Sequence, residues 1–311
     1  MGDQLGRLKV ASRANVPPFH VMDLLAAATS RQDSHGDLMN LVAGQPSAGA
    51  PRAVKEEAKR LLDEDLLGYT VATGVLPLRE AIANHHRATS GIEVSAEDVV
   101  VTTGSSGGFL LAFLSAFEAG DRVVMANPGY PCYRNVLSAL GCAVVEIQCG
   151  PETRFQPTLE QLQSLPGRID GLLIASPANP TGTMIAATEL ARIAAWCEAT
   201  GIRLISDEIY HGISYGPDTT CSWESSRSGI VFGSFSKYFA MTGWRLGWML
   251  VPEDLRRAVD VLTGNFTICP PTLSQYAAIA AFTPAARLEL DSHVQRYAAN
   301  RAVLLDGLVA L

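Results

Sequence analysis

The sequence lacks several features that would place it in other protein classes. Its six cysteines show no C-x-x-C spacing, which favours reduced thiols in a cytoplasmic protein, and we predict no metal site. No stretch reaches the roughly 18 consecutive apolar residues that a membrane helix needs. The N-terminal residues Met1–Arg7 lack the apolar run of a signal peptide. We therefore expect no membrane partner.

Blocks of basic residues are also missing. The chain of 311 residues carries 24 Lys and Arg against 31 Asp and Glu, which gives a net charge of −7. Nucleic acid and anionic membranes are therefore not expected partners. The hydrophobic content of 48% is enough for a large core and suggests one large domain plus a smaller one.

A short stretch rich in hydroxyl groups suggests a phosphate site beside a reactive amine. Ser234 and Ser236 flank a phenylalanine and are followed by Lys237, with Arg245 eight residues further on. Serine hydroxyls donate to phosphate oxygens, and a guanidinium binds phosphate through two parallel bonds. Lys237 becomes a candidate Schiff-base nucleophile if burial and neighbouring cations lower its pKa. The alternative interpretation is a solvated surface lysine near a turn.

Further motifs appear in a fixed order along the chain. Ser176–Gly182 reads S-P-A-N-P-T-G, Asp207–Tyr210 reads D-E-I-Y, and Ser234–Lys237 with Arg245 follow. Together they resemble the class I/II aminotransferases, which are fold type I enzymes dependent on pyridoxal phosphate (PLP). The resemblance runs from about Leu41 to about Ala281, which is most of the chain.

The resemblance implies an α/β fold of three layers, α/β/α, with a mostly parallel sheet and a second, small domain. It divides the chain into an N-terminal segment of the small domain (1–44), a large PLP-binding domain (45–284) and a linking helix (285–311). In the family a further piece of the small domain follows and carries the arginine that binds the substrate α-carboxylate. We therefore expect that arginine beyond residue 311, and that most of the small domain lies outside this sequence.

Hydrophobic periodicity predicts alternating strands and helices along most of the chain. The expected strands are Val99–Thr103, Arg122–Met125, Ala143–Gln148, Gly171–Ala175, Arg203–Ser206, Ile230–Phe232 and Arg245–Val251. The expected helices are Val21–Thr29, Ala53–Asp63, Leu76–His86, Phe109–Phe117, Leu159–Leu165, Glu189–Ala199, Pro252–Leu262, Pro271–Ala281 and a long final helix from about Pro284 to about Leu308.

The motif Asp207–Tyr210 follows an expected strand, where open α/β sheets bind their ligands. By resemblance, Asp207 faces the pyridine nitrogen of PLP and keeps it protonated, so that the ring accepts electrons from a carbanion. The alternative for Asp207 is the N-cap of a helix. Tyr210 and Asn179 are implied to hydrogen-bond the phenolic oxygen of the cofactor, and Asn179 is also a candidate substrate-binding residue.

The remaining cofactor contacts follow from the same resemblance. Gly104, Ser105 and Ser106 form a Gly/Ser turn between a strand and a helix, where free N–H groups and the helix dipole favour an anion. Tyr130 matches the aromatic residue that stacks on the pyridine ring. Tyr69 matches a tyrosine that reaches the cofactor of the neighbouring subunit, which implies a homodimer. We expect partner-subunit contacts near Asn265–Ile268 as well.

Gly44 lies in a short apolar run broken by Gly and Pro, where the main chain is implied to approach the substrate carboxylate. The alternative for Gly44 is an ordinary turn. Pro17, Pro18, Phe19 and Val21 are implied to line the entrance of the pocket, and such an apolar lining would favour neutral or aromatic amino acids.

The implied activity is transfer of an amino group from an α-amino acid to a 2-oxo acid by a ping-pong Schiff-base mechanism. Lys237 would carry the cofactor and then move a proton as general base and acid. The same chemistry also serves C–S β-lyases and related α-carbanion enzymes, which stay open here. An inactive or truncated PLP-binding protein is a further alternative. A PLP-sensing regulator is disfavoured, because residues 1–40 are too short for a helix-turn-helix.

Overall fold

The structure is a computed structural model that describes residues 8–64, 67–216 and 218–309. Within these residues one seven-stranded sheet has the order β1-β7-β6-β5-β4-β2-β3. Its strands are β1 (Val99–Thr102), β2 (Arg122–Asn127), β3 (Ala143–Gln148), β4 (Gly171–Ala175), β5 (Arg203–Asp207), β6 (Ile230–Ser234) and β7 (Gly247–Leu250).

All strand pairs are parallel except those of β7, which runs antiparallel to both β1 and β6. The helices are α1 (His20–His35), α2 (Arg52–Glu64), α3 (Leu76–Ser90), α4 (Gly104–Ala116), α5 (Pro131–Leu140), α6 (Leu159–Gln163), α7 (Ala187–Thr200), α8 (Glu253–Phe266), α9 (Thr272–Ile279) and α10 (Pro284–Val309). The predicted mostly parallel sheet is confirmed.

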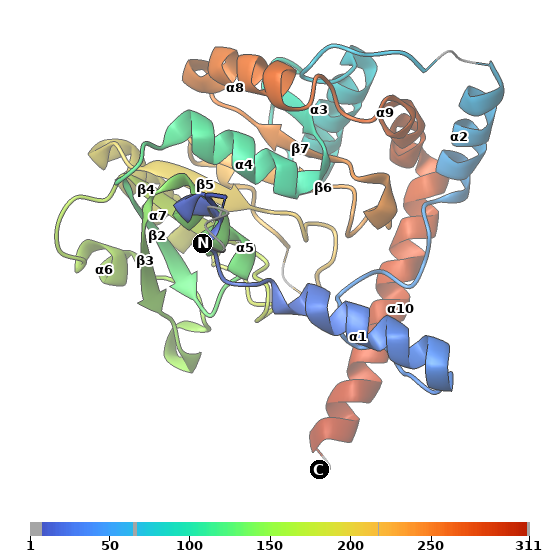
Figure 1. The fold of residues 1–311 in the computed structure, drawn as a ribbon, viewed down its shortest axis with the longest axis horizontal. Helices are drawn as coiled ribbons and strands as arrows, with labels where there is room; N and C mark the ends of the chain where they lie inside the picture. The colour runs from blue at the N-terminus through green and yellow to red at the C-terminus, as the bar shows by residue number, and fades with distance from the viewer. Residues whose placement is uncertain (1–7, 65–66, 217, 310–311) are drawn as a thin grey trace, which may run out of the picture.

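Side chains alternate between the two faces of the sheet and create a core on each side. In β4, Leu172 and Ile174 pack on the face covered by α7, whereas Leu173 packs on the face covered by α4 and α8. Figure 1 shows α4 and α8 above the sheet, with α3 and α9 on the side of β7. This arrangement is the three-layer α/β/α architecture that the sequence predicts.

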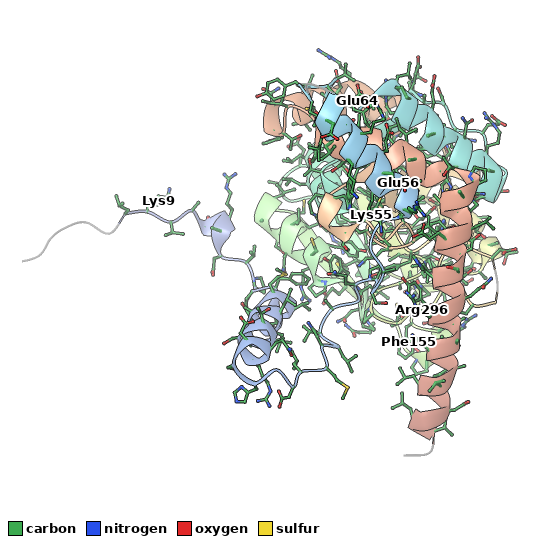
Figure 2. All side chains as sticks on the ribbon, turned by 90° about the vertical axis from the view of Figure 1, so that its right-hand side faces the viewer. Lys9, Lys55, Glu56, Glu64, Phe155 and Arg296 are labelled. Carbon is green, nitrogen blue, oxygen red and sulfur yellow. The ribbon has the colours of Figure 1, made fainter. Side chains whose placement is uncertain are left out.

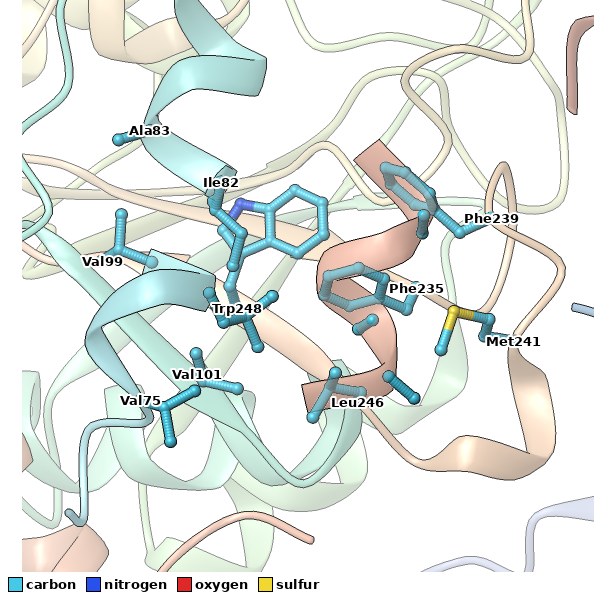
Figure 3. Close-up of a cluster of buried hydrophobic side chains, with 14 of the residues drawn as sticks. Val75, Ile82, Ala83, Val99, Val101, Phe235, Phe239, Met241, Leu246 and Trp248 are labelled. Atoms are coloured by element: carbon cyan, nitrogen blue, oxygen red, sulfur yellow. The ribbon is translucent and has the colours of Figure 1, made fainter. Parts of the chain in front are cut away.

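An aromatic cluster anchors the connection between β6 and β7. Phe235 is fully buried and packs edge-on against Trp248, with ring centroids 5.1 Å apart, as Figure 3 shows. Leu246 and Met241 are buried in the same cluster. The amide of Phe235 donates to the carbonyl of Leu246, and the amide of Met241 donates to the carbonyl of Phe235. Because Phe235 points into the core, its two serine neighbours are turned the other way.

Three element predictions need correction. Helix α4 begins at Gly104 rather than at Phe109, so Ser105 and Ser106 lie in its first turn and not in a preceding loop. Helix α5 was not predicted, although a proline at its first position is a known start signal. Strand β7 begins at Gly247, because Arg245 adopts a left-handed backbone conformation that ends a short 3₁₀ turn.

Two helices extend away from the three-layer body. The long helix α10 carries Arg296 on its lower half, and α1 lies on the opposite side of the molecule in Figure 2. Among the residues of α1 only Ala28 is buried. In the part of the chain that the structure describes, every helix is too short or too polar to cross a lipid bilayer.

Candidate active site

A cavity of about 210 Å³ lies at the carboxyl ends of β4, β5 and β6. We call it the site cavity. It brings together ten of the residues predicted from the sequence, which come from six separate segments of the chain: Ser105, Ser106, Tyr130, Asn179, Asp207, Tyr210, Ser234, Ser236, Lys237 and Arg245. This position at the ends of parallel strands is where α/β sheets bind ligands.

The amine of Lys237 is half-buried at the wall of the site cavity. Burial lowers the pKa of this amine, and the nearby Arg245 lowers it further, while Asp207 acts in the opposite direction. The Nζ atom donates to the carbonyl oxygen of Gly44 at 3.2 Å and lies 5.4 Å from the centre of the Tyr210 ring. An amine with a lowered pKa is more readily deprotonated and is a better nucleophile.

The carboxylate of Asp207 is almost completely buried, with 2% of the residue exposed. Burial raises its pKa from 3.8 to about 6, although hydrogen bonds from Tyr133 and from the Ile209 amide counteract the rise. Oδ1 accepts from the Ile209 N–H at 3.0 Å, and Oδ2 accepts from the Tyr133 hydroxyl. Residues 209–212, just after β5, form turns and not a helix, so the helix N-cap alternative for Asp207 is wrong. A buried carboxylate of this kind favours a cationic partner in the cavity.

An anion cup forms at the N-terminal turn of α4. Ser105 and Ser106 lie in this turn, and Arg245 reaches it from the β6–β7 connection. A side chain at Gly104 would place its Cβ only 2.5 Å from Nη2 of Arg245, so the absence of a side chain lets the guanidinium approach the helix. Arg245 forms no ion pair with any carboxylate in the described residues. Its charge is therefore available for an anion.

Three further side chains shape the cavity walls. Tyr130 is partly buried and contacts Phe19 edge-on, with ring centroids 5.7 Å apart. Burial raises the pKa of the Tyr130 phenol to about 12 and also raises that of Tyr210, whose pKa the Asn179 side chain lowers in part. Phe19 contacts Tyr130 but does not itself line the site cavity, so its role at the pocket entrance stays a prediction.

Three predicted residues lie outside the cavity lining, namely Gly104, Gly44 and Tyr69. Gly44 is exposed and meets the site only through its carbonyl contact with Lys237. Tyr69 is 83% exposed and does not line the site cavity of its own chain. Among the described residues, no group of three His, Cys, Asp or Glu side chains is arranged to hold a metal ion.

The sequence analysis missed Tyr133, which is buried and lines the site cavity. It lies in the first turn of α5, one helical turn after Tyr130, so both rings face the same side. The proline that starts α5 was the available signal, because it predicts the helix that carries Tyr133 to Asp207.

Comparison with known proteins agrees with this arrangement. A sequence model of the family described as aminotransferase class I and II matches residues 36–311. The chain is 62% identical over 302 residues to a valine–pyruvate aminotransferase of Mycobacterium tuberculosis, covering 96% of this chain and 78% of the relative.

The chain belongs to the class I and II aminotransferases. A crystal structure of an aminotransferase from M. tuberculosis superimposes with a TM-score of 0.96 at 62% identity, covering 97% of this chain and 79% of the other. Aspartate aminotransferase from Thermus thermophilus with maleate gives a TM-score of 0.93 at 29% identity, with 97% and 81% covered. The aminotransferase fold is therefore shown by structure as well as by sequence.

As an aminotransferase, the protein is a PLP-dependent enzyme that transfers an amino group from an amino acid to a 2-oxo acid. The relatives named above are all aminotransferases, which favours transfer over the β-elimination alternative. The residues of the site cavity fit this cofactor. The cavity combines a buried carboxylate at Asp207, an amine with a lowered pKa at Lys237, and the uncompensated guanidinium of Arg245 at a helix N-terminus.

Proposed function

We propose that this aminotransferase takes neutral aliphatic amino donors of the valine type and uses pyruvate as acceptor. The support is the 62% identity to a relative named for valine and pyruvate. An apolar contact beside the aromatic wall, from Phe19, is compatible with such a donor. The single observation that carries the assignment of the site is that Lys237, Asp207 and Arg245 line one cavity.

We propose the following roles for the cavity residues. Ser105, Ser106, Ser234, Ser236 and Arg245, with the main chain at Gly104, bind the phosphate of PLP. Ser234 Oγ accepts from the Ser236 amide, which leaves its hydroxyl hydrogen free to donate to an anion. Tyr130 stacks on the pyridine ring, and Asn179 with Tyr210 binds the phenolic oxygen.

Bound PLP supplies a carbonyl that condenses with amines and an electron-poor ring that accepts the electrons released when the substrate Cα proton departs. The Lys237 amine holds the cofactor and moves the proton from the substrate Cα, a role that its lowered pKa favours. The Asp207 carboxylate keeps the ring nitrogen protonated. The Gly44 main chain and Asn179 orient the substrate carboxylate.

The test of this assignment combines labelling with a panel of amino donors. The purified protein is loaded with PLP, reduced with borohydride and digested, and we expect the modified peptide to contain Lys237. The Lys237→Ala variant should show no borohydride-stable adduct and no transamination, while Lys55→Ala, an exposed lysine of α2, should behave like the unaltered protein. Labelling at any other lysine would contradict the assignment. Faster turnover with aspartate than with valine would contradict the proposed preference for valine-type donors.

We also propose that the enzyme is a homodimer in which Tyr69 reaches the cofactor of the partner subunit. The 83% exposure of Tyr69 and its absence from the lining of the site cavity in its own chain support this role. Tyr69→Phe and Lys237→Ala should each lose activity on their own. Mixing them should restore activity, because hybrid dimers contain one site with both residues intact. Mixing that restores nothing, from proteins that do form hybrids, would contradict a shared site.

Two smaller proposals concern the domain boundaries and the cellular location of the protein. The division into 1–44, 45–284 and 285–311 is supported by the exposed α1 and by the departure of α10 from the body. A cytoplasmic location is supported by the six cysteines, all of which are free.

A further inference from the structure

Two adjacent carboxylates at the end of β5 face different cavities. Asp207 lines the site cavity, whereas Glu208 lines a second cavity of about 490 Å³ between α3, the end of β6 and α10. We call it the rear cavity. The Glu208 side chain is only 3% exposed, yet the site described above gives it no role. A buried carboxylate without a function is costly, since desolvation penalises its charge.

One oxygen of Glu208 is satisfied and the other is not. Oε1 accepts from Ser206 Oγ at 2.9 Å and from the Ser222 amide at 2.7 Å. Oε2 is buried and has no hydrogen-bond partner, but it lies 3.5 Å from Nδ1 of His211. The unsatisfied oxygen is therefore directed at the imidazole of a residue next to Tyr210.

The other nitrogen of His211 determines where its hydrogens lie. Nε2 is 3.1 Å from the carbonyl oxygen of Ser176. A carbonyl oxygen only accepts, so Nε2 must carry a hydrogen. In a neutral imidazole Nδ1 would then present a lone pair to the lone pairs of Glu208 Oε2. A further proton between these two atoms removes the repulsion and satisfies both.

We propose that Glu208 and His211 hold one proton between Oε2 and Nδ1, and that His211 is a positioning residue for the cofactor-binding residues on either side of it. His211 follows Tyr210, and Ser176 begins the segment that carries Asn179. The imidazole thus joins the two segments that supply Tyr210 and Asn179 to the site cavity. This inference rests on the proposed roles of those two residues.

The surroundings leave His211 as the cation for Glu208. Among the described residues no Lys or Arg lies within ion-pair distance of this carboxylate. His85 and His86 of α3 are neutral, because burial lowers their pKa values to about 4 and about 3. The Cys221 thiol also faces Glu208, and burial with this carboxylate beside it raises the pKa of the thiol, which is therefore neutral. The other charged or titratable groups around the rear cavity are Arg287 and Asp291 of α10, Asp218, Glu224 and Tyr238.

The first test is nuclear magnetic resonance of ¹⁵N-histidine-labelled, cofactor-free protein at neutral pH. We expect one histidine with both ring nitrogens in the protonated range, and we expect its signals to vanish in His211→Gln. In Glu208→Gln the same ring should become neutral with its hydrogen on Nε2, because the new amide group donates to Nδ1. A neutral His211 in the unaltered protein overturns the proposal, whether or not the enzyme transaminates.

The second test asks whether the hydrogen bond between position 208 and His211 positions the cofactor-binding residues. Glu208→Gln keeps an acceptor at Oε1 and supplies an N–H donor at the position of Oε2, so kcat/KM should stay within about twofold. Glu208→Ala and His211→Ala should each lose about tenfold or more in kcat and shift the visible absorption of the bound cofactor. Glu224→Gln, an exposed carboxylate beside the same cavity, is the matched control and should change nothing. Equal losses in Glu208→Gln and Glu208→Ala, or unchanged activity in His211→Ala, would overturn the positioning role.

Discussion

The phenol of Tyr133 donates a hydrogen bond to Oδ2 of Asp207, and both side chains are buried behind the site cavity. Tyr133 comes from the first turn of α5, and Asp207 comes from the end of β5. Burial raises the pKa of Asp207, this hydrogen bond counteracts the rise, and the resulting pKa is about 6. Tyr133 therefore favours the ionised carboxylate near neutral pH, which is the form that would hold a protonated ring nitrogen.

Tyr133→Phe should weaken PLP binding by about 10- to 100-fold at neutral pH, the range for losing a hydrogen bond to a charged group. Without the Tyr133 hydroxyl the pKa of Asp207 should rise further. On acidification, PLP affinity should therefore begin to fall at a higher pH than in the unaltered protein. Fluorescence titration of cofactor-free protein with PLP across pH measures both effects. Tyr130→Phe removes a hydroxyl from the same cavity without touching Asp207 and should leave this pH dependence in place. Identical pH profiles for the two variants would contradict the role of Tyr133.

Gly104→Ala should weaken PLP binding by about tenfold or more, because the new methyl group would lie 2.5 Å from Nη2 of Arg245. The backbone at Gly104 has a φ of +67°, so alanine there also costs about 1 kcal/mol of folding free energy. PLP titration and urea unfolding separate the two effects.

Gly107→Ala is the control for that variant, one turn of α4 further on. Its Cβ would make only an ordinary contact, 3.7 Å from Thr103 Cβ. We expect unchanged PLP affinity and a stability equal to or about 0.5–1 kcal/mol above that of the unaltered protein, because alanine favours the helix. Equal PLP affinity in the two alanine variants would show that the position of the Arg245 guanidinium does not depend on the missing side chain at Gly104.

Asp207→Asn should stabilise the cofactor-free protein at neutral pH while abolishing transamination. The folded pKa of about 6 exceeds the ordinary value of 3.8, so between these values the folded state holds more protons than the unfolded state. Stability therefore falls as pH rises through this window, by about 3 kcal/mol in total. The increase in the free energy of unfolding caused by Asp207→Asn should be complete above about pH 6 and absent below about pH 4.

Urea unfolding of the cofactor-free variant at several pH values checks this expectation. Asp254→Asn, which alters an exposed carboxylate paired with Arg203, provides the comparison for a surface ion pair. That variant should change stability by at most about 1 kcal/mol. A loss of stability in Asp207→Asn at neutral pH would mean that burial of the carboxylate is compensated in the folded state.

Phe235→Ala should lower the free energy of unfolding by about 3–5 kcal/mol, since the side chain is fully buried against Trp248. Because Phe235 also orients its neighbours Ser234 and Ser236, PLP affinity should fall beyond what instability explains. Phe113→Ala, an equally buried change in α4, should cost similar stability with a smaller effect on affinity. Thermal unfolding with and without PLP provides the measurement.

The strands β4, β5 and β6 could be predicted because each is a buried run with a polar residue at or next to its carboxyl end. Asp207 and Lys237 are such cases, where the strand pattern and the chemistry coincide. The start of α4 was missed because three glycines among its first five residues have low helix propensity. Tertiary packing against β6 and β7 overrides that preference, since Gly108 lies against Phe232 and Met249.

The interactions of Tyr133, Glu208 and His211 could not be read from spacing along the chain. Tyr133 and Asp207 are 74 positions apart, and His211 meets Ser176 from 35 positions away. These contacts depend on parallel strands that bring distant turns to one edge of the sheet. The residue types in the sequence showed which side chains were candidates, but only the fold shows which of them form hydrogen bonds with one another.

The β6–β7 connection carries both Lys237 and Arg245, and its ends are fixed by Phe235 and Leu246 in one aromatic cluster. PLP attached to the Lys237 amine, with its phosphate bound by Arg245, would cross-link the two ends of this connection. Loss of PLP would then increase the mobility of this connection without unfolding the sheet. Protease cleavage between residues 238 and 244 would thus report whether the site is occupied.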